Sequence, residues 1–119
     1  MLDQFTQISS PRQDVIRDSS SWVAAWHDIY LPGFRPLPPV DFNTTTVLFA
    51  AMGERPTSAY DIFIDSVVSH EQGVAVYITE RSEPGCSAYQ TFVDPVHVVA
   101  APFRSSVWDW RTTFLTHTC

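Results

Sequence analysis

The chain has 119 residues, 45% hydrophobic and 17% charged, and its thirteen acidic residues against seven Arg and no Lys give a net charge of −6. This size and composition predict one globular domain over residues 1–119. An acidic chain without a basic patch is a poor binder of nucleic acid or anionic lipid surfaces. No apolar run approaches the roughly 18 residues of a membrane-spanning helix, so no membrane span is expected.

The N-terminal third of the chain predicts one strand, one helix and one extended segment. Alternation at residues 5–9 is typical of a short strand. A helix is expected over residues 18–30, capped by Ser19 or Ser20 and ended by Leu-Pro-Gly. Four prolines in and just before residues 34–42 favour extended backbone there. The helix should bury the residues that recur at helical spacing, which are Trp22, Ala25, Trp26 and Ile29.

From residue 44 onward, apolar residues recur with the period of two that is typical of strands. The residues 69–73 form a turn between two such runs, which makes a hairpin of their flanks. The fold class is therefore expected to be mainly β (α+β): an antiparallel β-sandwich or partly open barrel with one N-terminal helix. The predicted strands cover residues 44–52, 59–68, 74–80, 88–93, 96–101 and 106–115.

The two cysteines, Cys86 and Cys119, do not form a CxxC redox or zinc pattern. They leave three alternatives: two inert thiols, a disulfide, or one reactive thiol. A disulfide would stabilise the fold by roughly 3–4 kcal/mol and would place the protein outside the cytosol. The first ten residues do not have the pattern of a signal peptide. The expected location is extracytoplasmic after removal of a signal, with the cytoplasm as the alternative.

No pattern of catalytic or metal-ligating residues stands out. The four His residues share no metal-ligand spacing, and no GxSxG turn or phosphate-binding glycine loop occurs. Asp61 and Asp65 fall on one face of a predicted strand, where a hydrolase would need one raised pKa, and His97 would be the candidate base. A solvated strand face explains the three residues more simply. The chain is therefore expected to have no catalytic residues, no metal and no cofactor.

Trp108 and Trp110 share one face of the last predicted strand. Flat aromatic side chains stack on sugar rings, so the pair is a candidate platform for a small ligand or a glycan. Capping of the hydrophobic core is the alternative explanation.

Five segments follow one another in a recognisable order along residues 22–103. They are SWVAAW (21–26), PPVDF (38–42), VLFAAMGERPTSAYDIFI (47–64), EPGC (83–86) and QTFVDPVHVV (90–99). In this order and spacing the stretch resembles the family named after the protease complex subunit PrcB, although Ser58 and Ala59 stand where the family has two glycines. The resemblance implies a small secreted or lipid-anchored bacterial protein that associates with a protease, and it transfers no catalytic residue.

A fainter similarity concerns the loop at residues 53–59. RPTSAY (55–60) has Pro, Thr and Tyr at the offsets used by the chagasin-type inhibitors of cysteine proteases, without their glycine. That similarity implies an inhibitor that inserts the loop into an enzyme cleft. A stiff turn that only connects two strands is the alternative explanation.

The leading hypothesis is a non-catalytic module, monomeric or weakly homodimeric, that binds another protein, with a protease as the candidate partner. A proline-stiffened loop loses little entropy when a partner immobilises it. The predicted contact residues are Arg55, Pro56, Thr57 and Ser58, with Pro84 and Gly85 beside them.

Overall fold

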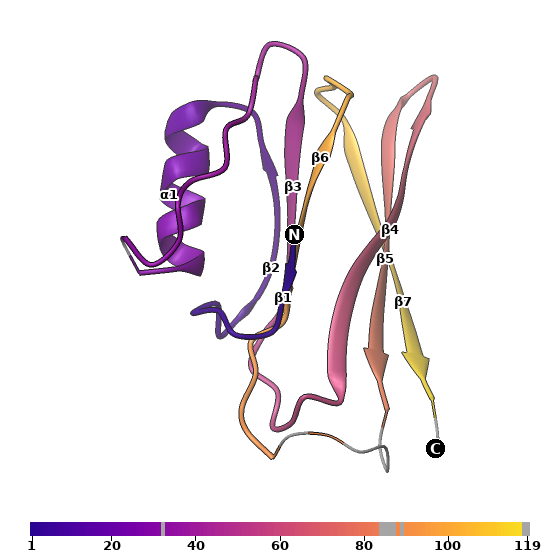
Figure 1. Cartoon of the computed structure of the whole chain (residues 1–119). Coiled ribbons are helices and arrows are strands. Elements are labelled where there is room, and N and C mark those ends of the chain that lie inside the picture. Colours follow the sequence, from indigo (N-terminus) through magenta and orange to yellow (C-terminus); the bar gives the residue numbers. More distant parts are fainter. Residues whose placement is uncertain (32, 84–87, 89, 118–119) are drawn as a thin grey trace.

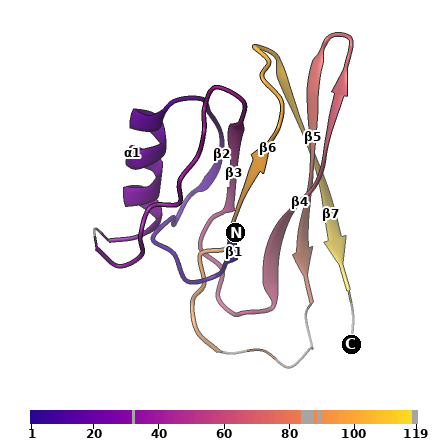
Figure 2. The ribbon, with the colours of Figure 1, turned by 45° about the horizontal axis from the view of Figure 1, so that its top comes forward.

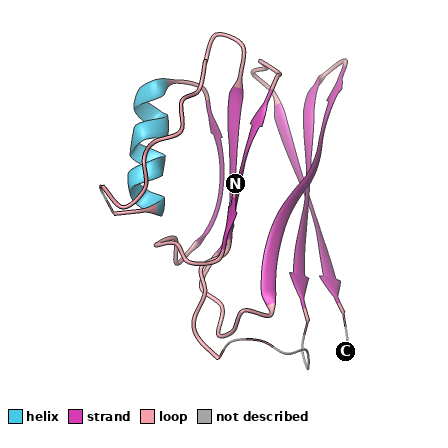
Figure 3. Cartoon of the chain, viewed as in Figure 1, coloured by secondary structure: helices cyan, strands magenta, loops and turns pink. Residues whose placement is uncertain are grey.

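The computed structural model describes residues 1–31, 33–83, 88 and 90–117, and within them the chain forms three layers (Figures 1 and 3). Helix α1 covers one face of a four-stranded sheet with the order β1-β6-β3-β2, and a three-stranded sheet with the order β4-β5-β7 covers the other face (Figure 2). The elements are β1 (Leu2–Asp3), β2 (Pro11–Ile16), α1 (Ser19–Ile29), β3 (Thr46–Met52), β4 (Tyr60–His70), β5 (Gly73–Ser82), β6 (Val96–Ala101) and β7 (Trp108–Thr116). The expected β-rich sandwich with one helix is confirmed.

Helix α1 buries the predicted face, but its cap differs from the predicted one. The Asp18 carboxylate, and not Ser19 or Ser20, accepts the hydrogen bond from the Ser21 N–H at 2.8 Å. A carboxylate at this position satisfies backbone donors that the first helical turn leaves unpaired. The indoles of the helix donate to the proline-rich segment that follows it, at Trp22 Nε1 to Pro38 O (3.0 Å) and Trp26 Nε1 to Arg35 O (3.1 Å).

Strand β3 is buried along its whole length because a different layer covers each of its faces. Successive side chains of a strand point to opposite faces. The odd-numbered residues of β3 therefore enter a helix-side core, and the even-numbered ones enter a sheet-side core between the two sheets. The helix-side core includes Trp22, Trp26, Val47, Phe49 and Ala51. The sheet-side core includes Leu48, Ala50, Met52, Ile62, Ile64, Val76 and Ile78.

The prediction of a strand at residues 5–9 is wrong, because this segment forms bends and no strand. The Asp3 carboxylate accepts a hydrogen bond from the Phe5 N–H at 2.9 Å, and the Thr6 hydroxyl accepts one from the Ile8 N–H at 3.3 Å. Such local side-chain bonds fold the backbone into turns and compete with strand pairing. The sheet instead gains β2, which the sequence pattern did not predict.

The strand predicted at residues 88–93 is also absent from the described part of this segment. Val93 alone pairs with another strand-like residue, through an isolated antiparallel bridge to Arg55. The next predicted strand, residues 96–101, is confirmed as β6. Val93 is therefore held to the 53–59 loop by this single bridge and not by a strand ladder.

The direction of one strand pair departs from the expected antiparallel arrangement. Strands β5 and β7 run parallel, with Val74 opposite Trp108 and Ser82 opposite Thr116 (Figure 1), whereas the other ladders are antiparallel. Between these two strands the chain visits the other sheet to form β6, as a parallel connection requires a crossover. Both strands therefore end at the same end of the sheet. No helix among the described residues has the length and apolarity to cross a bilayer.

Candidate functional site

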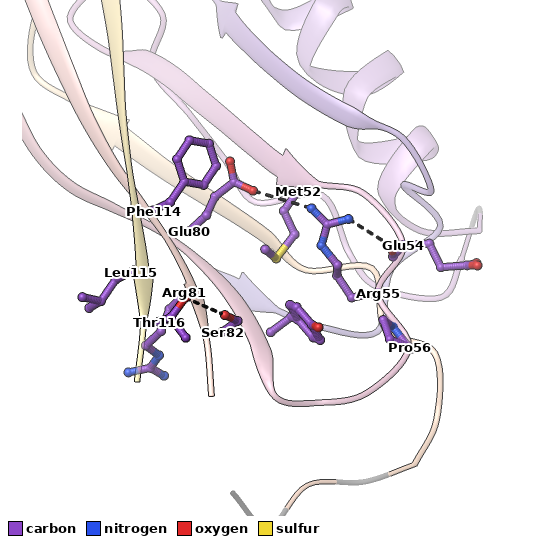
Figure 4. A pocket seen from close by; sticks show the side chains of 11 residues that line it. Met52, Glu54, Arg55, Pro56, Glu80, Arg81, Ser82, Phe114, Leu115 and Thr116 are labelled. Atoms are coloured by element: carbon purple, nitrogen blue, oxygen red, sulfur yellow. Dashed lines mark hydrogen bonds and ion pairs between the residues drawn. The ribbon is translucent and has the colours of Figure 1, made fainter. Parts of the chain in front are cut away.

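A groove of about 500 Å³ opens at the end of the three-stranded sheet where β5 and β7 finish (Figure 4). The loop 53–59 forms one side of the groove, and the last residues of β7 form the other. The predicted loop is therefore one side of a larger surface, and the sequence pattern did not predict the other side at the end of β7. The lining residues are Met52, Glu54, Arg55, Pro56, Tyr60, Glu80, Arg81, Ser82, Phe114, Leu115 and Thr116.

The inward faces of β5 and β7 supply a carboxylate and an exposed aromatic ring. On β5, the buried Val76 and Ile78 are followed on the same face by Glu80, whose Cα partner on β7 is Phe114. Figure 4 shows the Phe114 ring beside the Glu80 side chain. Phe114 is 76% exposed and its neighbour Leu115 is 51% exposed. The sheet-side core ends before it reaches these residues, so this end of the sandwich presents apolar side chains to solvent.

The loop begins at a residue that must be glycine. Gly53 has φ +84°, in the left-handed region that side chains disfavour. A Cβ atom added there would lie 2.9 Å from Cδ of Pro11, the first residue of β2. Both conditions fix the direction in which the chain leaves β3, and they place the following loop beside the groove.

Hydrogen bonds hold the loop in one conformation. Arg55 and Val93 exchange two backbone bonds, of 2.8 and 2.9 Å. The Gln4 side-chain amide donates to the carbonyl oxygen of Ser58 at 3.0 Å, and the Thr57 hydroxyl accepts from the Ala59 N–H at 3.2 Å. A loop that is already ordered loses little conformational entropy on binding.

The predicted contact residues differ in how much of each is accessible. Pro56 is exposed, while Arg55, Thr57 and Ser58 are half-buried. Glu54, which was not predicted, is the other exposed residue of the loop. Pro84 and Gly85, predicted to lie beside the loop, are outside the described residues, as are Cys86 and Cys119.

The groove contains a desolvated carboxylate that has a distant cationic partner. Glu80 Oε1 lies 3.9 Å from Arg55 Nη2, at the limit of an ion pair. Burial raises the pKa of Glu80 above its ordinary value, and the attraction of Arg55 offsets only part of this effect. Arg55 also lies over the Tyr60 ring, with its guanidinium carbon 5.9 Å from the centroid. Glu80 is therefore a carboxylate whose desolvation Arg55 only partly compensates.

The two tryptophans of β7 cap the core. Trp108 and Trp110 are half-buried and pack against the sheet-side core. The Trp108 Nε1–H donates to the carbonyl oxygen of Ser105 at 2.8 Å. Two indoles held in this way do not present the open pair of faces that a sugar ring would need, so the geometry favours the core-capping alternative.

Asp61 and Asp65 each have a partner on β5. Asp61 accepts from Arg81 Nη2 at 3.1 Å, and Asp65 accepts from the Thr79 hydroxyl. The β4 ladder shifts register between residues 64 and 66, so Asp65 lies at a bulge. The strand face that the sequence assigned to both carboxylates is interrupted there.

His97 joins the two sheets at this bulge. Its Nδ1 accepts a hydrogen bond from the Ile64 N–H at 2.8 Å, and burial lowers its pKa. The backbone bond occupies the nitrogen that a general base would use. Among the residues that the structure describes, no three His, Cys, Asp or Glu gather into a possible metal site.

The segment that carries the loop is similar to a known protein family. Residues 46–102 match the PrcB C-terminal family. The resemblance to PrcB is thereby confirmed for a shorter stretch than the 22–103 proposed from sequence, and this stretch runs from the start of β3 to just past the end of β6. Strand β7, with the aromatic side of the groove, lies outside the PrcB match. No curated protein and no solved structure matches the chain.

Sequence reasoning missed Glu80, Phe114 and Leu115. A signal existed for Glu80, because it occupies an inward position in a strand whose earlier inward residues are apolar. Phe114 carried no such signal. It continues the alternation of Trp108 and Trp110, and the pattern alone predicts that it is buried like them.

Proposed function

We propose that the chain is a non-catalytic, extracytoplasmic module that binds another protein, a component of a protease complex, through the groove between the 53–59 loop and the end of β7. The PrcB C-terminal match supports the association with a protease complex. The location rests on the resemblance to the PrcB family alone, which implies a secreted or lipid-anchored protein. One observation carries the choice of surface: an ordered loop, a partly desolvated Glu80 and an exposed Phe114 line one opening.

Exposed aromatic side chains beside polar groups are typical of protein-binding surfaces. Phe114 can enter a pocket of the partner, while Glu54 and Pro56 lie exposed at the other side of the groove. The carboxylate of Glu80, paired with Arg55 across 3.9 Å, suits recognition of a cation. These features describe a binding surface and require no chemical step.

The test is capture of partners from a cell-surface extract of the native host on immobilised protein, followed by identification of the bound proteins. Phe114→Ser and Arg55→Ala should each reduce the capture of a protease component. Phe34→Ser is a matched control, because Phe34 is 67% exposed and lies beside α1, away from the groove. Equal capture by wild type and Phe114→Ser would refute the groove as the binding surface.

The same capture experiment separates an accessory module from an inhibitor. The activity of the captured protease is measured with and without an excess of the chain. Unchanged or higher activity supports the accessory role, whereas loss of activity that Pro56→Ala relieves supports insertion of the loop in the manner of the chagasin-type inhibitors.

A further inference from the structure

Strand β7 has one edge that no other described strand covers. It pairs with β5 on one side and ends the three-stranded sheet on the other. Two backbone bonds define which groups face β5: the Val74 N–H donates to Val107 O at 3.0 Å, and the His117 N–H donates to Ser82 O at 2.9 Å. Because bonding alternates along a parallel pair, the odd-numbered residues of β7 bond to β5. The even-numbered residues, among them Phe114 and Thr116, direct their N–H and C=O groups to the free edge.

The C-terminal half of this edge lacks the features that protect edge strands from pairing. Proteins protect edges with charged residues, proline, bulges or short length. Strand β1 has two residues, β2 begins Pro11-Arg12, and β4 contains the bulge at Asp65. The first half of β7 has Asp109 and Arg111, but residues 112–116, Thr-Thr-Phe-Leu-Thr, contain no charge and no proline.

A contact with β2 marks where the open part of the edge begins. The Gln13 side-chain amide donates to the Thr112 hydroxyl at 3.4 Å, so β2 approaches β7 at that residue. Beyond it, Phe114, Leu115 and Thr116 line the groove. The edge-directed backbone groups of Phe114 and Thr116 therefore border an opening that could admit a further strand.

The charges at the groove favour a cationic occupant. Two carboxylates, of Glu54 and Glu80, and two guanidinium groups, of Arg55 and Arg81, line the groove. Arg81 is already paired with two further carboxylates, those of Asp61 and Glu83, both at 3.1 Å. Arg55 reaches Glu80 only at 3.9 Å, and Glu54 is exposed. No hydrogen bond to the Glu80 carboxylate occurs among the described residues. The net charge of −6 for the whole chain has the same sign.

We propose that an extended segment of the partner protein adds as a strand to the free edge of β7 at Phe114–Thr116. An Arg or Lys side chain of this segment would point across Phe114 toward Glu80. This inference rests on the proposed function. Strands lie about 4.8 Å apart, so an inward residue of the added strand is about 10 Å from Glu80. Two long side chains span that separation together. The cation would cross the exposed face of the Phe114 ring, which attracts it.

The probe is a short capped peptide of alternating Thr and Val with a central Arg, added to isotopically labelled protein. Amide exchange at Phe114 and Thr116 should slow on binding, while that at Leu115, already bonded to β5, should change little. Two N-methylated peptides, each blocked on one alternate set of amides, provide the control for strand addition. One of them should lose binding and the other should retain it.

The charge requirement is tested with citrulline in place of the central Arg, since citrulline keeps the shape and removes the charge. Wild type should bind the Arg peptide about fivefold more tightly than the citrulline peptide, the effect of one partly exposed ion pair. Glu80→Gln should remove this preference. Equal binding of both N-methylated peptides, no response of the β7 amides at millimolar peptide, or an unchanged Arg preference in Glu80→Gln would overturn the proposal.

The proposal and the proposed function fail in different ways. If the peptides leave β7 unaffected while Phe114→Ser still abolishes partner capture, strand addition is wrong and the groove remains the binding surface. If capture ignores every groove variant, the proposed function is wrong whatever the peptides do. Slow exchange at Phe114 and Thr116 that depends on protein concentration without peptide would assign the edge to a second copy and overturn the proposal.

Discussion

The substitution Phe114→Ala should leave the stability of the fold almost unchanged, although it removes an aromatic ring from the inward face of a sheet. Phe114 keeps 76% of its surface exposed, so folding removes only about a quarter of it from water. Full burial of a Phe side chain contributes about 2 kcal/mol, and a quarter of this is about 0.5 kcal/mol. Phe49, which is 0% exposed in the helix-side core, provides the contrast, because Phe49→Ala should cost about 3–5 kcal/mol.

The assay is urea unfolding followed by tryptophan fluorescence, since Trp22 and Trp26 lie in the helix-side core and report its loss. Both variants should show the same dependence on urea concentration as wild type, so that the midpoints compare stability directly. A loss of more than about 1.5 kcal/mol in Phe114→Ala would mean that the ring is buried in solution. The groove would then be closed, and both proposals would lose their surface.

Three further predictions concern other residues. Gly53→Ala should lower the free energy of unfolding by about 1–3 kcal/mol in the same assay, because a φ of +84° disfavours any side chain and the added Cβ would lie too close to Pro11. An unchanged urea midpoint would contradict this account. Burial lowers the pKa of His97 from 6.5, so protonation of His97 favours the unfolded chain. The free energy of unfolding should therefore fall as the pH drops below about 6.5, until the folded-state pKa is reached. His97→Gln should reduce this fall, and an equal pH dependence of stability in wild type and variant would refute the account. An extracytoplasmic location predicts a Cys86–Cys119 disulfide, so reduction should raise the intact mass by two hydrogen atoms, and an unchanged mass would argue against it.

The parts of the fold that could be predicted are those with a strong local pattern. Residues 46–52 are apolar or β-branched throughout, and β3 formed there as expected. The spacing of Trp22, Ala25, Trp26 and Ile29 predicted the buried face of α1. In both cases the local preference and the tertiary packing agree, which makes the sequence informative.

The parts that could not be predicted depend on tertiary contacts. Strand β2 reads Pro-Arg-Gln-Asp-Val-Ile, with few apolar residues, and all six residues pair with β3. Arg12 adds tertiary contacts, since it lies over the Phe49 ring and ion-pairs with Asp28 of α1. The parallel direction of β7 leaves no trace in a period-two pattern, which is the same for either direction. The exposure of Phe114 also cannot be read from the sequence pattern, since it depends on where the opposite sheet ends.

Because a layer covers each face of β3, this single strand separates the two hydrophobic cores of the molecule. Leu48 and Phe49 are adjacent in the chain, yet Leu48 packs in the sheet-side core and Phe49 packs in the helix-side core. Detachment of α1 would expose only the helix-side core, with Phe49, to water and would leave the packing between the two sheets intact. Amide exchange should therefore resolve two tiers of protection, with the helix opening at lower energy than the strands behind the groove.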